Sequence, residues 1–336
     1  MVKIDDVARH AGVAPSTVSY VLSGKRTISE QTRERVMRSV RTLGYHPHAG
    51  ARALASNRSN VVALVVPLRS GIHVPVIMQF ATSVVTEART FDHDVLLLTQ
   101  DEGVAGLQRV AGTSLVDAII VMDVELHDNR LPALRALKRP AVLIGVPEDA
   151  SGLTCIDLDF TAAGAVCLNH LAGNGHRRVA LIGSPPEVYK RETGFATRLL
   201  GGFRQAAGQR RVKVSAYPCE PTEAAAKAVV EKLMAERPRV TGVVIHNESI
   251  IGHVLNAFAH KGAQVPDDIS VVAICPDEQA EQARPSLTSV AIPADELGRS
   301  AVRMLMGELA RGEHVSSTTL LPPKLTERQS TAMLVG

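Results

Sequence analysis

The sequence predicts an α/β protein in which a small all-helical head precedes a larger core of parallel sheets. Three observations support this fold class. Residues 3–24 carry apolar side chains at helical spacing on either side of a glycine. From Val61 onward, short runs of valine, isoleucine and leucine alternate with amphipathic segments, which is typical of parallel sheets covered on both faces. The length of 336 residues suits two or three folding units.

Residues 3–24 are predicted to form two short helices joined by a tight turn. The apolar residues of the first helix recur at i, i+3, i+4 and i+7: Ile4, Val7, Ala8 and Ala11. Gly12 allows the sharp turn, and Pro15 suits the first turn of the second helix. The residues left exposed on that second helix are small or polar, as in a helix-turn-helix that enters a DNA major groove. An ordinary helical hairpin at a domain edge is the alternative.

The charge distribution supports a nucleic-acid partner for the head alone. Residues 1–60 contain ten Lys and Arg against four Asp and Glu, a net charge of +6. The rest of the chain contains 27 basic and 30 acidic residues, a net charge of −3. A basic head on a mildly acidic body favours the phosphates of double-stranded DNA as its partner.

A third helix and a linker follow the helix-turn-helix. Ser29 is a predicted N-cap for the third helix, and Gly44 is its predicted end. Residues 48–55 form a helix too short to be stable alone in water, so we expect it to be ordered on DNA or against a partner chain. We therefore divide the chain into a head (1–46), a linker with a hinge helix (47–60) and a core (61–336).

The core is predicted to contain eight strands separated by helices. The strands are Val61–Val66, Val95–Leu98, Ala118–Val121, Ala141–Val146, Val179–Ile182, Val212–Tyr217, Gly242–His246 and Ile269–Ile274. Helices are expected near 76–90, 129–138, 160–172, 195–208, 222–236, 249–261 and 295–311. Ligands of such folds bind at the carboxyl ends of the strands.

Several classes of protein are disfavoured. No apolar run is long enough to cross a membrane, and no signal peptide is evident, so a cytoplasmic, nucleoid-associated protein is expected. The four cysteines form no C-x-x-C pair, and no metal site, disulfide or cofactor is predicted. Walker A, G-x-S-x-G and H-E-x-x-H motifs are absent. His246-Asn247-Glu248 fits half of a zinc-deaminase motif, but the P-C-x-x-C half is missing. No catalytic residues are therefore assigned.

The N-terminal motifs carry a family resemblance. Asp6-Val7-Ala8, Ala11-Gly12-Val13 and Ser16-Thr17-Val18-Ser19 resemble the start of LacI-family bacterial repressors, and the resemblance continues loosely over nearly the whole chain. It implies a two-lobed core like that of periplasmic binding proteins, a homodimer on a pseudo-palindromic operator, and a small-molecule effector, first of all a sugar. The resemblance also makes residues 48–55 the hinge helix, with Leu54 as a minor-groove wedge. Gly50 departs from the family pattern and weakens that helix.

The resemblance assigns site residues as follows. The residues expected to contact DNA are Pro15, Ser16, Thr17, Ser19, Tyr20, Lys25, Arg26, Arg52 and Leu54. The residues expected to bind the effector are His73, Arg191, Thr193, Arg198, Asn247, Glu248, Cys275 and Asp277.

Alternatives remain for several of these residues and for the function. Gly145 and Cys275 stand where the family has carboxylates, so a phosphorylated, carboxylated or nucleobase effector is the alternative to a sugar. Arg198 could form a surface ion pair, His73 and His246 could be structural, and Asn247 could cap a helix. An enzyme or a sugar-binding transport protein on the same core is the alternative function, and a regulator could be induced or corepressed.

Overall fold

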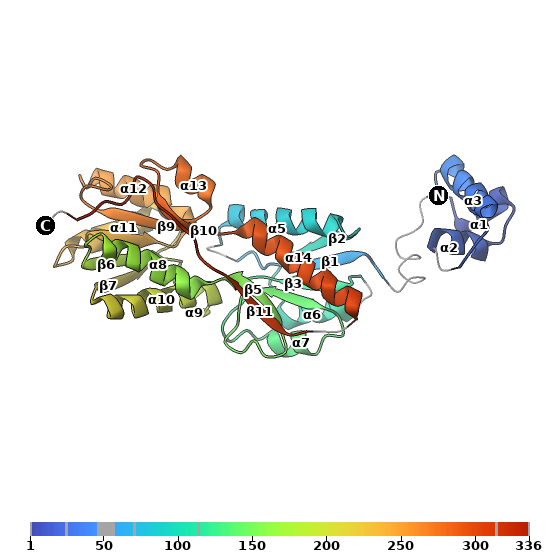
Figure 1. The fold of residues 1–336 in the computed structure, drawn as a ribbon, viewed down its shortest axis with the longest axis horizontal. Helices are drawn as coiled ribbons and strands as arrows, with labels where there is room; N and C mark the ends of the chain where they lie inside the picture. Colours follow the sequence, from blue (N-terminus) through green and yellow to red (C-terminus); the bar gives the residue numbers. More distant parts are fainter. Residues whose placement is uncertain are drawn as a thin grey trace.

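The computed structural model describes residues 2–23, 26–45, 58–69, 72–112, 115–312 and 315–334. The head consists of helices α1 (Ile4–Ala11), α2 (Pro15–Ser23) and α3 (Glu30–Leu43), which pack around Val7, Val18 and Val36 (Figure 1). Gly12 and Gly44 have φ angles of 63° and 60°, so the predicted turn and helix end are confirmed. The Ser29 hydroxyl accepts a hydrogen bond from the Thr32 N–H at 3.4 Å, which confirms the predicted cap.

The core contains two six-stranded sheets, one in each lobe. The N-lobe strands are all parallel, in the order β11-β5-β4-β3-β1-β2. These strands are β1 (Val61–Val65), β2 (Asp94–Leu98), β3 (Ala118–Val121), β4 (Ala141–Ile144), β5 (Thr154–Leu158) and β11 (Ser317–Leu321). The N-lobe helices are α5 (Val74–Arg89), α6 (Gly103–Gly112), α7 (Leu131–Arg135) and α14 (Ala294–Arg311).

The C-lobe sheet has the order β12-β10-β9-β8-β6-β7, in which only β12 runs antiparallel. Its strands are β6 (Arg178–Gly183), β7 (Lys213–Pro218), β8 (Gly242–Ile245), β9 (Ser270–Cys275), β10 (Thr288–Ala291) and β12 (Leu325–Thr326). Its helices are α8 (Phe160–Gly173), α9 (Pro186–Lys190), α10 (Gly194–Arg210), α11 (Glu223–Ala235), α12 (Ile251–His260) and α13 (Asp277–Gln282), with a 3₁₀ turn at Glu248–Ile250.

The chain passes between the lobes three times. It leaves the N-lobe after β5, returns after β10 into α14, and crosses again between β11 and β12. The last two elements of the N-lobe, α14 and β11, are therefore drawn in red beside its cyan and green elements (Figure 1). Since three segments join the lobes, each lobe is completed by a part of the chain distant in sequence.

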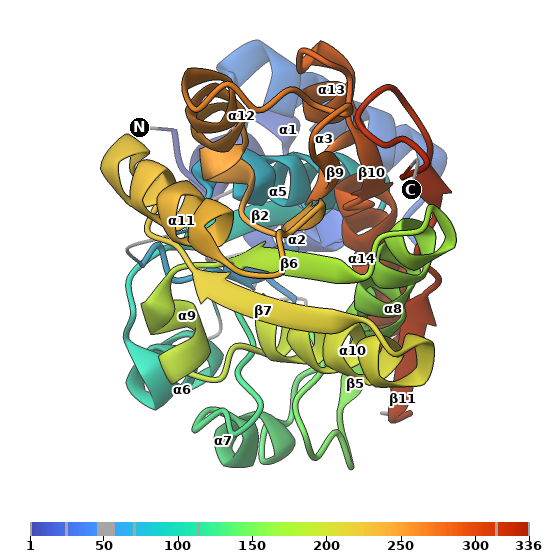
Figure 2. The same ribbon diagram turned by 90° about the vertical axis from the view of Figure 1, so that its left-hand side faces the viewer.

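The interior strands of each sheet are covered on both faces, as their apolar residues predict. In the C-lobe, Ala180 and Val243 face a core shared with α11 and α12, whereas Val179 and Val244 face the core of α8 and α10. Figure 2 shows β6 and β7 between these two helical layers. The N-lobe repeats the arrangement, with α5 and α14 on one face and α6 and α7 on the other.

The prediction of eight strands was wrong in number, because β5, β10, β11 and β12 were missed. The β5 and β11 sequences, Thr-Cys-Ile-Asp-Leu and Ser-Thr-Thr-Leu-Leu, carry polar residues that interrupt the apolar pattern. The eight predicted strands all occur, with ends that differ from the prediction by at most two residues. Helices α6, α9 and α13 were also missed; α9 and α13 are only five and six residues long. Within the described residues, no helix is both long enough and apolar enough to span a membrane.

Candidate DNA-binding helix and effector cavity

Helix α2 presents a polar face of the kind that reads DNA. Val18 and Val21 are buried, while Pro15 and Ser16 are exposed. Thr17, Ser19 and Tyr20 are partly exposed on the same helix. The Arg26 guanidinium lies 5.6 Å from the centre of the Tyr20 ring, within the range of a cation–π contact. Of the other predicted DNA contacts, Lys25, Arg52 and Leu54 lie outside the described residues, as does the predicted hinge helix.

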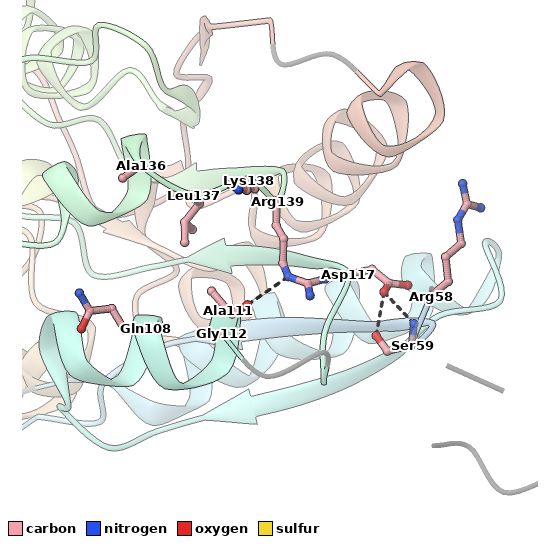
Figure 3. A pocket seen from close by; sticks show the side chains of 10 residues that line it. All are labelled: Arg58, Ser59, Gln108, Ala111, Gly112, Asp117, Ala136, Leu137, Lys138 and Arg139. Atoms are coloured by element: carbon pink, nitrogen blue, oxygen red, sulfur yellow. Dashed lines mark hydrogen bonds between the residues drawn. The ribbon is translucent and has the colours of Figure 1, made fainter. Parts of the chain in front are cut away.

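The chain enters the core at a buried carboxylate. Asp117, immediately before β3, accepts hydrogen bonds from the Ser59 N–H at 2.7 Å, the Ser59 hydroxyl at 2.9 Å and the Asn60 N–H at 2.8 Å. Figure 3 shows this carboxylate facing Ser59. Asp117 therefore fixes the segment that leads from the linker to β1.

A surface pocket of about 510 Å³ lies beside this anchor (Figure 3). Its basic residues are Arg58, Lys138 and Arg139. Arg139 already donates to the carbonyl oxygens of Ala111 and Val116. The pocket is lined by the N-lobe and the entering chain alone, so a ligand in it would not contact both lobes. We therefore place the effector site elsewhere.

A cavity of about 150 Å³ lies between the lobes. It is surrounded by the carboxyl ends of β1, β3, β4, β5, β6, β8 and β10, the position predicted for a ligand site. Its charged and polar lining includes His73, Asp123, Asp157, Ser184, Arg191, His246, Asn247 and Glu248. Both lobes contribute to this lining, so a bound molecule would touch both.

An aromatic wall closes one side of the cavity. The rings of Phe160 and Phe195 are 5.8 Å apart, and each lies within 5.8 Å of the His246 imidazole. Phe160 begins α8 and Phe195 lies in the first turn of α10, so the packing of these two helices positions the wall. His246 follows β8 and is 3% exposed.

Burial changes the proton affinities of the cavity residues. It raises the pKa of Asp157 and that of Glu248 to about 7 in each case, because the charged carboxylates lose water. It lowers the pKa of His246 to about 4 and also lowers the pKa of His73. The Nδ1 atoms of both histidines are buried without a hydrogen-bond partner. The protein therefore leaves the hydrogen-bonding capacity of both atoms unused.

An ion cluster joins the lobes at the rim of the cavity. Arg191, from the C-lobe, contacts Asp123 at 3.0 Å and Glu125 at 3.2 Å, both from the N-lobe. Arg69 contacts the same two carboxylates at 2.7 and 3.1 Å and pairs with Asp101. Arg69 is 20% exposed and Asp123 is 6% exposed at the side chain, so these contacts are only weakly screened by solvent.

Backbone bonds continue this junction. The Gly194 N–H donates to the Val124 carbonyl, and the Leu126 N–H donates to the Glu192 carbonyl, each at 2.9 Å. Arg198, from α10, donates to the carbonyl oxygens of Val146 at 3.3 Å and Pro147 at 2.8 Å. The lobes are therefore in contact along one side of the cavity.

The structure brings together half of the predicted effector residues. His73, Arg191, Asn247 and Glu248 line the cavity. Asn247 does not cap a helix with its side chain, because its amide donates to the carbonyl oxygens of Gly183 and Cys219.

The other half lies outside the cavity lining. Arg198 makes a lobe-to-lobe contact in place of the surface ion pair that was the alternative. Thr193 is fully buried at the junction, Cys275 is fully buried in the C-lobe core, and Asp277 pairs with Arg328 at 3.0 Å.

Sequence reasoning missed several cavity residues, among them Asp123, Asp157, Phe160, Ser184 and Phe195. A signal for Asp157 was present, since a carboxylate at the end of a parallel strand faces the ligand edge of the sheet, but the strand itself was not predicted. Among the described residues, no three His, Cys, Asp or Glu side chains are grouped so as to hold a metal ion.

Comparison with known proteins agrees with this architecture. Residues 3–48 match the model described as bacterial regulatory proteins of the lacI family, and residues 168–331 match a periplasmic binding protein-like domain. Catabolite control protein A of Priestia megaterium is 27% identical over 337 residues, which cover 98% of this chain and 99% of that protein.

Two solved structures extend the similarity. A complex of the transcriptional regulator CelR with cellobiose is 25% identical, with a TM-score of 0.68, over 98% of this chain and all of that one. The lac repressor dimer bound to operator and the anti-inducer ONPF has a TM-score of 0.84 at 23% identity, over 98% and 99% of the two chains, and shows the shared fold. Because its head, its core and its full-length relatives agree, the chain belongs to the LacI family of transcriptional regulators, with a DNA-binding and an effector-binding domain.

Proposed function

We propose that the protein is a dimeric repressor that binds a pseudo-palindromic operator. A small molecule that occupies the inter-lobe cavity, a carbohydrate as the first choice, either weakens or strengthens operator binding. The observation that carries the proposal is the combination of a polar recognition helix with a cavity lined by both lobes. We propose the division into head, linker and core on the same grounds. Operator binding would place the protein at the nucleoid.

The recognition surface consists of the exposed residues of α2. Pro15 and Ser16 lie at the start of the helix, where a helix-turn-helix contacts base edges. Tyr20 lacks the bidentate donor pair that reads guanine, so a contact with a thymine methyl group or a phosphate suits it better. Arg26, held near the Tyr20 ring, is placed to contact phosphate.

An uncovered apolar face supports a dimer. Val74, Met78 and Val85 share one face of α5 and are 44–47% exposed. Strand β2 forms the edge of the N-lobe sheet, and its consecutive residues Leu96 and Leu97 are 37% and 41% exposed. Strands of a parallel sheet are normally covered on both faces, so a second copy packed here would complete the sheet's covering.

Effector and operator binding are coupled if each favours a different arrangement of the lobes. A molecule that contacts both Asp157 and Glu248 stabilises the closed arrangement relative to an open one. By linkage, an effector that weakens operator binding is itself bound more weakly when the operator is present. The same reciprocity holds, with the opposite sign, for a corepressor.

The test is a selection of DNA sequences from a random pool by the full-length protein, with its mass measured by analytical ultracentrifugation. We expect enrichment of a two-fold symmetric sequence, bound by a dimer. The double substitution Ser16→Ala and Tyr20→Ala is the control, and it should abolish the enrichment while leaving the dimer intact. A wild-type protein that enriches no sequence would refute the proposed function.

A further inference from the structure

The inter-lobe cavity and its rim contain more carboxylates than cations. Arg69 and Arg191 are surrounded by three carboxylates, those of Asp101, Asp123 and Glu125. These two arginines are therefore already neutralised. The cavity is also lined by two other carboxyl groups, those of Asp157 and Glu248.

Neither of these two groups has an ion pair among the described residues. Asp157 is 6% exposed, and among the described residues its carboxylate has one hydrogen-bond donor, the Leu158 N–H, which bonds Oδ1 at 2.9 Å. Glu248 also lines the cavity, and no described Lys, Arg or His lies within ion-pair distance of it. Asp157 is the penultimate residue of a strand of the N-lobe and Glu248 follows a strand of the C-lobe, so the cavity receives one such group from each lobe.

The cations nearest the cavity contact acceptors of the protein, although the Nε of Arg191 is buried without a hydrogen-bond partner. Arg191 directs one terminal nitrogen at Asp123 and Glu125. Arg198 acts on Asp157 through its charge, but its guanidinium donates to the carbonyl oxygens of Val146 and Pro147. A phosphate or carboxylate ligand that paired with Arg191 would lie beside the carboxylates of Asp123 and Glu125, and Asp157 and Glu248 add two further carboxyl groups to the same cavity.

The remaining walls suit a small cation that also carries polar groups. Phe160 and Phe195 line the cavity, and an aromatic ring attracts a cation that lies over its face. His73 and His246 are kept neutral by burial, and their unpartnered Nδ1 atoms would bond a ligand hydroxyl. The volume of about 150 Å³ holds about ten water molecules at roughly 10–15 Å³ each, which is space for a ligand of monosaccharide size.

We infer that the effector is a compact cation, of monosaccharide size or smaller, whose protonated amine pairs with Asp157 and Glu248; an amino sugar fits better than a neutral or phosphorylated sugar. The inference rests on the proposed function, since it names the class of molecule that occupies the same cavity. A buried carboxylate without a partner is costly, and Asp157, at 6% exposure, has no counter-ion among the described residues. An ammonium group supplies that counter-ion and allows both carboxyl groups to ionise.

The test compares matched ligands on the full-length wild-type protein by thermal shift at pH 7. Glucosamine, galactosamine and mannosamine are each compared with the parent sugar and its 6-phosphate, and ethanolamine and putrescine serve as amines without a sugar ring. We expect at least one amine to raise the unfolding midpoint through mass action, and to do so at concentrations at least tenfold below its neutral and phosphorylated counterparts.

Substitutions locate the site of the amine. Asp157→Asn and Glu248→Gln conserve shape and remove charge, and each should weaken the effective amine at least tenfold. Glu278→Gln, at an exposed carboxylate of α13 in the C-lobe, is the matched control and should leave the response unchanged.

Each other outcome overturns the inference. A neutral or phosphorylated sugar that acts at lower concentration than its amine contradicts the cationic class but leaves the proposed function intact. If no amine raises the unfolding midpoint, the inference is also contradicted. The same holds if Asp157→Asn and Glu248→Gln both keep the wild-type thermal shift with the amine. Failure of the proposed function would be seen separately, in the DNA selection.

Discussion

Two glycines allow α8 and α10 to approach so closely that an added methyl group has no space. A Cβ atom at Gly202 would lie 1.9 Å from the Thr161 carbonyl oxygen, and one at Gly164 would lie 2.2 Å from the Leu199 carbonyl oxygen. Both obstacles are backbone atoms, so no side-chain rotation relieves the overlap. Gly202→Ala must therefore move one helix relative to the other.

The size of the effect follows from this geometry. The distance of 1.9 Å at Gly202 is about 1.6 Å shorter than an ordinary contact of about 3.5 Å. Overpacking of this kind costs about 3 kcal/mol, the upper part of its usual range. Alanine recovers about 1 kcal/mol through its better helix propensity. The net loss of about 2 kcal/mol corresponds to a fall in Tm of roughly 4–8 °C for a unit of 150–250 residues.

The neighbouring residue provides a matched control. Gly201 is exposed on the same helix, and a Cβ atom there would meet nothing within 4 Å. Gly201→Ala should therefore stabilise the protein by about 0.5–1 kcal/mol. Urea unfolding of both variants, followed by circular dichroism, measures the difference. If Gly202→Ala proved as stable as Gly201→Ala, the close packing of α8 and α10 would not exist.

Three further predictions concern DNA binding, the linker and pH. Tyr20→Ala should change the preferred base at one symmetric pair of operator positions, and a selection that returned the same consensus would exclude this base contact. Asp117→Ala leaves three hydrogen-bond donors at Ser59 and Asn60 without their acceptor. It should therefore lower the free energy of unfolding in urea by about 1–3 kcal/mol and reduce the influence of the effector on operator affinity. Asp149→Ala, at an exposed carboxylate, is the control. Because burial raises the pKa of Asp157 to about 7, this group's contribution to stability is complete below about pH 4 and lost as pH rises to about 7. The measurement is the difference in Tm between wild type and Asp157→Asn as a function of pH. This difference removes the opposing effect of His246, whose pKa of about 4 makes the protein less stable as pH falls from about 6.5 to 4. A Tm difference that did not change with pH would contradict the raised pKa of Asp157.

The parts of the structure that were predicted correctly are those in which a local backbone conformation or hydrogen bond favours one residue type. Gly12 and Gly44 adopt the left-handed backbone that only glycine adopts freely, and Ser29 caps α3, so the helices of the head follow from the sequence. The eight apolar strands were found for a similar reason, because burial on both faces leaves a continuous run of valine, isoleucine and leucine.

The unpredicted parts depend on contacts between segments distant in sequence. Strand β5 carries Thr154, which is buried because it bonds Glu308 at 2.6 Å in α14, over 150 residues away. Asp157 lies on the same strand, and it was not predicted to line the cavity because the strand itself was not predicted. Arg198 was placed in the right region, but its partners are carbonyl oxygens of the other lobe, and no property of its own helix shows this.

One strand connects the cavity to the linker. Strand β3 begins directly after Asp117, which holds the entering chain, and ends shortly before Asp123, which lies in the cavity and pairs with Arg191 of the C-lobe. The six residue steps from Asp117 to Asp123 span about 20 Å at about 3.3 Å per step. All four residues of β3 are buried, and β1 and β4 pair with it on both sides, so the strand moves with its sheet and cannot bend locally. If a ligand alters the contact between Asp123 and Arg191, we therefore expect the N-lobe to rotate as a unit, and Asp117 to carry that rotation to Ser59 and Asn60.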